Sequence, residues 1–467
     1  MEQNSIPQAA PDKNNNRKTI VVVVILTSFA TAFTGSSLNL SLPAIAFDYG
    51  QSATMVGWMV TIYALSVAAF AVPFGRIADI TSRRRILLIG IAVFSACCGL
   101  SAVSPNFTLL LILRFAQGIG ASMVFSTNSA IIISAFPPNM RGKAIGFNLA
   151  ATYTGLSSGP VIGGIMNQHL GWRSIFVFTC ILTLAALCLA CLKVPRDSVQ
   201  IKNRPLDLKG NLLFVVFIIS FMFGLSQIAE SLVQAMIFIA VGVVCGILFI
   251  LHEYREEDPA VNVRLFKSNI GFGLSNLSAM MNYSVTAGLS YLMSLYLQVI
   301  QGFSSQTAGL IMVSQPLIMA LFTTYMGKLS DRISPFKLSS GGMAVTGAGI
   351  ASLIFMNENT PLWAIILALL VIGFGFAMFS SPNTNAIMSG VDKKDYGVAS
   401  SLVSTMRSIG QSVGMVVILM ISSFILGATP LAEASHPLLL KTLHISFGVS
   451  TCICIAGIFV SLQRNKA

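Results

Sequence analysis

The chain has 467 residues, of which 55% are hydrophobic and only 9% are charged, whereas a soluble domain carries roughly 25% charged residues. A chain of this length cannot cover a water-exposed surface with so little charge, which excludes a soluble globular protein. The high hydrophobic content also excludes a disordered chain, and 8 cysteines are too sparse for a disulfide scaffold. The composition therefore predicts a polytopic membrane protein.

The cysteines lie within or beside apolar runs, where a thiol behaves as a small hydrophobic group. Cys188 and Cys191 have the spacing of a metal or redox pair, but the sequence offers no second pair and no flanking histidine. We therefore expect no disulfide, no metal site and no cofactor.

Fourteen apolar stretches recur along the chain, and each is long enough to cross a hydrocarbon core of ~30 Å as a helix. The predicted fold class is accordingly an all-α membrane protein with 14 transmembrane helices. The predicted spans are residues 19–42, 54–74, 86–104, 107–133, 144–167, 174–193, 211–229, 231–251, 271–298, 306–326, 337–356, 361–384, 398–427 and 442–463.

The positive charges are distributed unevenly between the two sides of the membrane. An even number of spans places both termini on one side, and 24 of the 28 Lys and Arg residues fall on that side. The opposite loops contain Arg173 and Lys441. Because Lys and Arg concentrate in cytoplasmic loops, both termini are predicted to be cytoplasmic. The net charge of +12 thus reflects orientation in the bilayer and does not indicate a nucleic acid partner.

The chain contains an internal repeat. At an offset of 255 residues, identical residues align at Gly118 and Gly373, Asn128 and Asn383, Gly155 and Gly410, and Gly159 and Gly414. At an offset of 252, Gly75 to Asp79 aligns with Gly327 to Asp331. Both halves keep the same charge bias, so they are parallel repeats, an arrangement typical of transporters with a site at the interface.

This repeat predicts five segments along the chain. They are a disordered cytoplasmic tail (1–18), an N-terminal six-helix bundle (19–193), a two-helix insertion with its flanking cytoplasmic loops (194–270), a C-terminal six-helix bundle (271–463) and a cytoplasmic tail (464–467).

Several short motifs follow one another in a recognisable order. They are the loop from Gly75 to Arg85, the span 4 residues Arg114, Gln117, Gly118 and Gly120, the span 5 residues Gly155, Gly159, Pro160, Gly163 and Gly164, the segment Trp172 to Phe176, and the pairs Leu38-Asn39 and Leu42-Pro43. Together with fourteen spans, this ordered set resembles the fourteen-helix drug/proton antiporter family of the major facilitator superfamily.

The resemblance implies roles for three groups of residues. The conformational gate that latches the halves comprises Gly75, Arg76, Asp79, Arg83 and Arg84, with Gly327, Asp331 and Arg332 in the second half. The antiporter-type hinge comprises Gly155, Gly159, Pro160, Gly163 and Gly164, and the proton-coupling candidates are Arg114 and Arg407. The alternatives are a solvated turn that obeys the charge bias, close helix packing through small residues, and snorkelling of the arginines to an interface.

The residues themselves explain why these positions stand out. Arg114 and Arg407 are the charged side chains that we place inside predicted spans, where an ionisable group costs at least ~2.5 kcal/mol and usually serves function. Pro160 removes a backbone hydrogen bond within a glycine-lined helix face and permits a bend. Polar residues that could line a substrate cavity, or could serve only helix packing, are Thr27, Thr31, Thr34, Gln117, Asn128, Asn276, Tyr283, Gln315 and Asn383.

No carboxylate falls in the middle of a predicted span. Many cation exporters of the family carry an aspartate nine residues before the Leu-Pro proline, and that position is Thr34 here. The proton carrier and the charge of the substrate are therefore left open.

We expect a transporter and not an enzyme, because the sequence lacks a Ser/His/Asp set, a metal cluster and a nucleotide-binding loop. The leading hypothesis is a monomeric exporter of small amphipathic, drug-like molecules in the cytoplasmic membrane of a prokaryote, driven by proton antiport. The alternatives are an exporter of a neutral or anionic metabolite and, from another class, a membrane-embedded enzyme or sensor.

Overall fold

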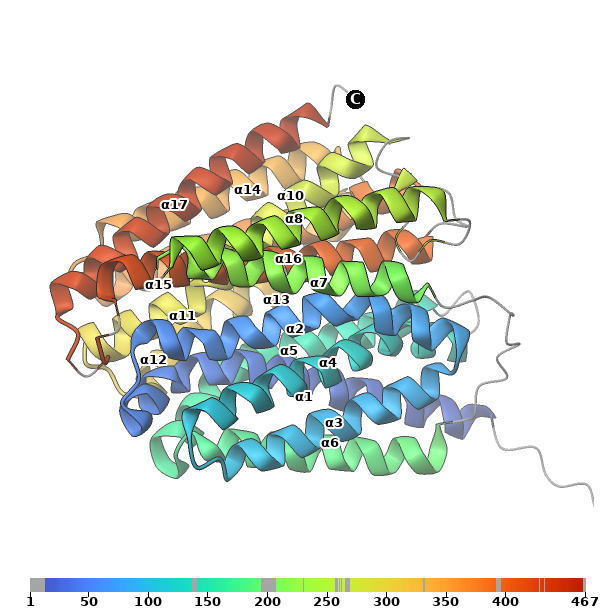
Figure 1. Cartoon of the computed structure of the whole chain (residues 1–467), viewed down its shortest axis with the longest axis horizontal. Coiled ribbons are helices and arrows are strands. Elements are labelled where there is room, and N and C mark those ends of the chain that lie inside the picture. Colours follow the sequence, from blue (N-terminus) through green and yellow to red (C-terminus); the bar gives the residue numbers. More distant parts are fainter. Residues whose placement is uncertain are drawn as a thin grey trace, which may run out of the picture.

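The computed structural model describes residues 13–136, 141–194, 207–229, 231–256, 259, 261, 263–264, 269–330, 332–391, 396–427, 429–431 and 433–464. Within these residues, long helices lie side by side (Figure 1). Their bounds are α1 Lys13–Tyr49, α2 Ala53–Ile80, α3 Arg83–Ala102, α4 Phe107–Ala135, α5 Arg141–Leu170, α6 Arg173–Lys193, α7 Leu208–Gln227, α8 Leu232–Arg255, α10 Ile270–Ala287, α11 Leu289–Leu295, α12 Ser305–Met312, α13 Ser314–Ser330, α14 Pro335–Ser352, α15 Leu362–Ser389, α16 Tyr396–Leu426 and α17 His436–Gln463.

Every predicted span coincides with a helix or with a helix interrupted by a break. In the described part of the chain, 12 helices are long and apolar enough to cross a membrane. The helices α5 and α10 are not among them, because both are rich in glycine and polar residues. One expectation was wrong in its boundary: α1 begins at Lys13, so residues 13–18 of the predicted disordered tail are helical.

The helix ends define two faces of the bundle. The terminal face contains the start of α1, the α2–α3 turn and the end of α17, and the opposite face contains the α1–α2 turn (Figure 1). Polar caps keep the turns short: Ser52, Ser82 and Asn106 each accept a hydrogen bond from a backbone N–H in the first turn of the following helix. Such caps satisfy donors that a helix start would otherwise leave unpaired.

Two spans that the sequence predicts as continuous helices are broken. The span 271–298 divides at Gly288 into α10 and α11, and continues as a π-helical turn, Tyr296–Ile300. Gly288 lies against Ile418 of α16, which leaves no room for a side chain. The span 306–326 breaks at Val313, between α12 and α13. Pro316 follows that break, and its ring cannot donate a hydrogen bond to the preceding turn.

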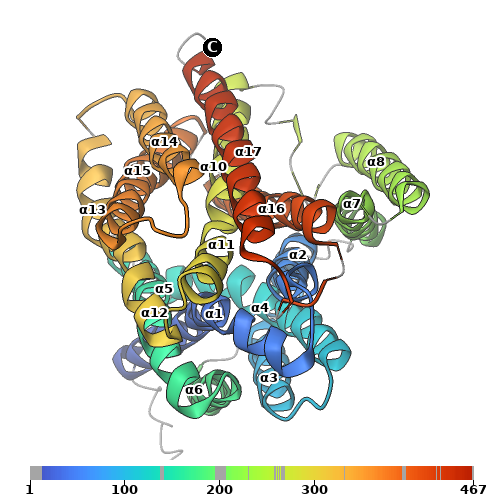
Figure 2. The ribbon, with the colours of Figure 1, turned by 90° about the vertical axis from the view of Figure 1, so that its left-hand side faces the viewer.

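The helices form two bundles with a peripheral pair (Figure 2). Helices α1 to α6 make one bundle and α10 to α17 the other, and α7 and α8 lie together at the edge, beside α2 and α16. The rings of Phe214 and Phe249 pack 5.2 Å apart between α7 and α8. The outer side of α8 exposes a row of large apolar side chains, as expected for a helix that faces lipid.

A large apolar cluster joins the two bundles near the opposite face. It includes Leu40 and Leu42 of α1, Tyr291 of α11, and Met415 and Ile418 of α16. The halves are thus packed against each other at this end of the molecule.

The contact of α3 with α4 generates a test of the packing. A Cβ atom added to Gly120 would lie 2.8 Å from the backbone N of Phe94, whereas one added to Gly35 would meet nothing within 4 Å. We expect Gly120→Ala to destabilise the protein by about 1–3 kcal/mol. The control Gly35→Ala should be neutral or stabilising, because alanine favours the helix. The apparent melting temperature in detergent measures both, and equal melting temperatures would contradict this packing.

Candidate functional site

The predicted hinge glycines lie where α5 approaches two other helices. A Cβ atom at Gly155 would lie 2.6 Å from the carbonyl oxygen of Phe29 in α1. On another side of α5, a Cβ atom at Gly164 would lie 2.6 Å from the carbonyl oxygen of Ser305 in α12. Gly309 of α12 in turn lies directly against the carbonyl of Pro160. Helix α5 therefore sits between α1 of its own half and α12 of the other half at backbone contact distance.

The remaining hinge residues follow the same pattern. Gly159 and Gly163 pack against Ser36 and Ser37 of α1, and the Ser36 hydroxyl donates to the carbonyl of Leu156 at 3.0 Å. Small residues at this spacing let two helix backbones approach closely. The glycines at four-residue spacing thus form the contact between α5 and α1.

Side-chain hydrogen bonds join the two halves at the opposite face. Asn167 of α5 donates to the Ser305 hydroxyl at 2.7 Å, and Gln298 donates to the carbonyl oxygen of Leu40 at 2.8 Å. The Tyr291 hydroxyl donates to the carbonyl oxygen of Ala53 at 2.7 Å. An isolated antiparallel bridge also pairs Ser52 with Pro430. The structure is therefore closed at this face, whereas α14 and α17 diverge from α3 and α6 toward the terminal face (Figure 1).

Arg114 lies inside the first half and is fully engaged there. Its side chain is 1% exposed, its Nη1 donates to Gln117 Oε1 at 2.5 Å, and its Nε donates to the carbonyl oxygen of Met59 at 3.2 Å. The guanidinium also lies 4.3 Å from the ring centre of Tyr63, a favourable cation–π distance. The structure thus brings the predicted coupling residue Arg114 together with the predicted cavity residue Gln117, between α2, α3 and α4.

The predicted cavity residues of the first half mostly form hydrogen bonds with one another or with neighbouring helices. The Asn128 amide donates to Thr27 at 3.0 Å and to Ser28 at 3.1 Å, which ties α4 to α1. Thr34 donates to Thr179 of α6 at 3.0 Å or to the carbonyl oxygen of Ala30 at 2.7 Å, and Thr31 donates to the carbonyl oxygen of Thr27 at 2.9 Å. In this conformation these buried hydroxyls connect helices.

The second half repeats the asparagine contact and adds an arginine that the sequence did not point to. Asn383, which aligns with Asn128, donates to the carbonyl oxygen of Ser275 in α10 at 3.2 Å. Its Oδ1 accepts a hydrogen bond at 2.5 Å from Arg464, which also donates to the hydroxyls of Ser275 and Ser339 at 3.2 Å each. Arg464 is 3% exposed, although the sequence placed it in the cytoplasmic tail. Burial lowers the pKa of Arg464 to about 10, so the guanidinium stays charged at neutral pH.

A third polar cluster lies between the halves, and we call it the Arg407 cluster. The Arg407 guanidinium of α16 lies 4.7 Å from the ring centre of Tyr283 in α10. The Tyr283 hydroxyl is 3.3 Å from the Ser380 hydroxyl of α15. Tyr153 of α5 packs against Tyr283, and its side chain interacts with Ser380 and with Thr323 of α13. The Arg407 cluster therefore combines side chains of both halves, and the sequence identified Arg407 and Tyr283 but not Tyr153.

Two predicted cavity residues stand apart from these networks. Asn276 donates to the carbonyl oxygen of Phe272 at 3.0 Å within its own helix, α10. Gln315 is half-buried next to the break between α12 and α13, where Gly373 of α15 packs against its carbonyl.

The predicted gate residues lie at the terminal face. Arg83 donates twice to Asp79, with its Nη2 at 2.8 Å and its Nε at 3.0 Å. Arg84 donates to the carbonyl oxygens of Val194 and Cys191 at the end of α6, at 2.7 and 2.9 Å. Gly75 and Arg76 occupy the last turns of α2.

The corresponding residues of the second half are described in part. Gly327 packs on Ser381 of α15, and Arg332 is exposed in the turn after α13. Asp331 lies outside the described residues.

The inserted helices carry buried charge that the sequence assigned to loops. Asp207 caps α7 and its Oδ1 lies 2.8 Å from His252 Nε2 of α8. The neighbouring Glu253 is fully buried, and its Oε2 accepts a hydrogen bond from the backbone N of Val261 at 3.1 Å. These groups fix the loop that follows α8.

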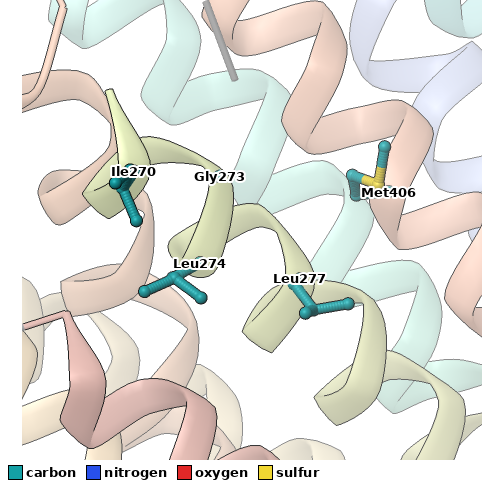
Figure 3. A pocket seen from close by; sticks show the side chains of 5 residues that line it. All are labelled: Ile270, Gly273, Leu274, Leu277 and Met406. Carbon is teal, nitrogen blue, oxygen red and sulfur yellow. The ribbon is translucent and has the colours of Figure 1, made fainter. Parts of the chain in front are cut away.

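A separate apolar pocket lies beside the second half. Its volume is about 400 Å³. The lining comprises Ile270, Gly273, Leu274 and Leu277 of α10 and Met406 of α16 (Figure 3). No polar side chain lines it, so it offers hydrophobic contact without specific recognition.

Two helix bundles with a polar cluster at their interface are an arrangement typical of secondary transporters. The sequence agrees with this class, because the Major Facilitator Superfamily profile matches residues 24–415 and 272–463. The chain belongs to the major facilitator superfamily, is a multi-pass secondary transporter and is not an enzyme.

Similar proteins come from bacteria. The chain is 30% identical to the riboflavin transporter RibZ of Clostridioides difficile over 389 residues, which are 83% of this chain and 84% of RibZ. It is 29% identical to the multidrug resistance protein Stp of Mycobacterium tuberculosis, over 82% of this chain and 71% of Stp. It is 28% identical to the multidrug efflux pump LfrA of Mycolicibacterium smegmatis, over 82% of this chain and 76% of LfrA.

Solved structures share the fold at low sequence identity. A bacterial homologue of the human lysosomal transporter Spinster, in an inward-facing and unoccupied conformation, superposes with a TM-score of 0.69 at 15% identity and covers 97% of both chains. A peptide transporter of the POT type in complex with sulfate gives a TM-score of 0.70 at 13% identity, over 98% of this chain and 99% of that chain.

The contact of Asn383 with Arg464 generates a second test. Replacement by Asn383→Leu removes an acceptor from a buried guanidinium, which should cost about 1.5–3 kcal/mol. In the double variant Asn383→Leu with Arg464→Met the charge is gone, so the loss should be smaller than the sum of the single losses. Melting temperatures in detergent for the four proteins of this cycle measure the coupling. Strictly additive losses would show that the two side chains do not depend on each other.

Proposed function

We propose that the protein exports small amphipathic, drug-like molecules across the cytoplasmic membrane of a prokaryotic cell, in exchange for protons. In this proposal it is a fourteen-helix drug/proton antiporter with cytoplasmic termini and acts as a monomer. The terminal face is then the cytoplasmic face, and the structure represents a state closed to the outside. The observation that carries the proposal is the closed opposite face, with a polar cluster of both halves buried beneath it.

The geometry supports alternating access. The Arg407 cluster receives side chains from α5 in one half and from α10, α13, α15 and α16 in the other. Opening the opposite face requires that the Asn167–Ser305 and Gln298–Leu40 hydrogen bonds break and that α12 leaves α5. Rocking of the two bundles about this contact would expose the cluster to one side and then to the other.

The proposed gate and hinge act at the two ends of this motion. Asp79 and Arg83, with the arginines beside them, would hold the halves together at the terminal face in the outward-facing state, which this structure does not represent. The glycine face of α5 would guide the motion, because two smooth helix surfaces can shift without a side chain to obstruct them. The division into an N-terminal bundle, a two-helix insertion and a C-terminal bundle belongs to the same proposal.

Relatives support export of drug-like compounds. Two of the bacterial relatives are named for multidrug resistance or efflux, and a third for riboflavin transport. These names differ in substrate, so an exporter of a neutral or anionic metabolite is the second candidate, favoured by the absence of a carboxylate from the described Arg407 cluster.

Proton coupling is tested with the purified protein in liposomes. An imposed proton gradient, acidic inside, should drive a lipophilic dye into those liposomes in which the protein's terminal face points outward. An uncoupler should collapse the accumulation, because the gradient is the only source of free energy. Empty liposomes are the control. Undiminished accumulation after the uncoupler would contradict proton antiport, and accumulation in empty liposomes would reflect partitioning of the dye alone.

A further inference from the structure

Arg114 and Arg407 differ in which of their N–H donors lack an acceptor. The Nε of Arg114 donates to the carbonyl oxygen of Met59, and its Nη1 donates to Gln117 Oε1; both partners lie in the same half. The Nε of Arg407 is buried and finds no hydrogen-bond acceptor among the described residues. A buried donor without an acceptor is costly, and a guanidinium edge is shaped to bind a carboxylate with two parallel hydrogen bonds. Arg407 thus keeps one buried donor, its Nε, without an acceptor, while its side chain is also hydrogen-bonded to Tyr283.

The side chains around Arg407 are flat and aromatic. Tyr283 stacks beneath the guanidinium, and Phe376 packs edge-to-face on Tyr283, with ring centres 5.3 Å apart. Tyr153 closes the cluster from α5. The hydroxyl of Ser380 lies at its edge. These side chains pack on one another in the closed state, and once the halves separate they can stack on a planar aromatic molecule while the hydroxyls bind its polar substituents.

The charge around the cluster favours an anion. In the described chain, the carboxylates lie at helix ends, at caps or in loops, namely Asp48, Asp79, Asp207, Glu253, Glu256, Glu358 and Glu433. Thr34 of α1 is also uncharged, and it is buried and hydrogen-bonded to Thr179. A cation bound between the halves would face Arg407 without a counter-ion from these residues, and juxtaposed like charges are strongly unfavourable.

We propose that the Arg407 cluster is the substrate site and that it selects planar aromatic organic anions over cations of the same shape. This inference rests on the proposed function, since it names the substrate class of that exporter. The carboxylate of the substrate accepts a hydrogen bond from the Nε of Arg407, and its ring system stacks against Tyr283 and Tyr153. The Nε of Arg407 gains an acceptor when the anion is bound.

Two xanthene dyes of similar shape and opposite charge test the selectivity. Binding of fluorescein, an anion, and of rhodamine 6G, a cation, is followed by fluorescence anisotropy with the purified full-length protein in detergent. Fluorescein should bind at least about tenfold more tightly than rhodamine 6G. This assay needs no gradient, so its result is independent of proton coupling, and failure of coupling in liposomes would leave it intact.

Variants of Arg407 locate the selectivity. Arg407→Gln should lower fluorescein affinity at least about tenfold and bring the two dyes to similar affinities. Arg407→Lys should retain part of the preference, because it keeps the charge but loses the paired donors. Arg264→Gln, at an exposed arginine of the loop after α8, is the matched control and should behave as the unmodified protein. A monodisperse peak in size-exclusion chromatography establishes that each variant is folded.

Three results would overturn the proposal. They are tighter binding of rhodamine 6G than of fluorescein, no binding of fluorescein, and an unchanged preference in both the Arg407→Gln and the Arg407→Lys variants. If the unmodified protein showed no preference for fluorescein but gradient-driven transport persisted, the exporter would stand and the assignment of its substrate class would fall.

Discussion

The structure depends on the close approach of α5 to helices of both halves. Gly155, Gly159 and Gly163 bring α5 onto α1, and Gly164 brings it onto α12 of the other bundle. Because there is no driving force from water between helices in a bilayer, such contact rests on close packing and on hydrogen bonds between helices. The Asn167–Ser305 bond lies at the same contact. Together with the apolar cluster at the opposite face, these contacts hold the two bundles against each other in this state.

Polar side chains inside the helices divide into two groups with different consequences. One group ties helices together within a half: Arg114 with Gln117, Asn128 with Thr27, and Asn383 with Arg464. These pairs are satisfied, and they make each half behave as one body. The second group, around Arg407 and Tyr283, lies between the halves and keeps a donor without an acceptor. Alternating access works by rocking of two rigid halves around a binding site at their interface. A hydrogen-bond donor without an acceptor at that interface is suited to bind a molecule there.

The sequence predicted most of the fold because the bilayer imposes a length on each helix and the repeat aligns the halves. It also identified Arg407, Tyr283 and Asn383, because polar residues within apolar spans are conspicuous. It missed Arg464, because this residue follows the last predicted span and resembles the other positive charges of the terminal face. It missed Tyr153 as well, since only packing reveals that the one tyrosine of α5 faces the other half. It missed the break at Gly288, although a glycine inside an apolar helix favours such a break, and the packing of Ile418 of α16 against this glycine appears only in the folded structure.

In the proposed mechanism, the halves must separate at the opposite face for transport to proceed. A cysteine-free background, with the 8 native cysteines replaced, allows Asn167→Cys and Ser305→Cys to be introduced together at side chains now joined by a 2.7 Å hydrogen bond. We predict that oxidation forms a disulfide between α5 and α12 and stops gradient-driven dye transport. A reductant should break the disulfide and restore transport. Each single variant should transport in both conditions. Undiminished transport with the disulfide formed in nearly all molecules would contradict the account.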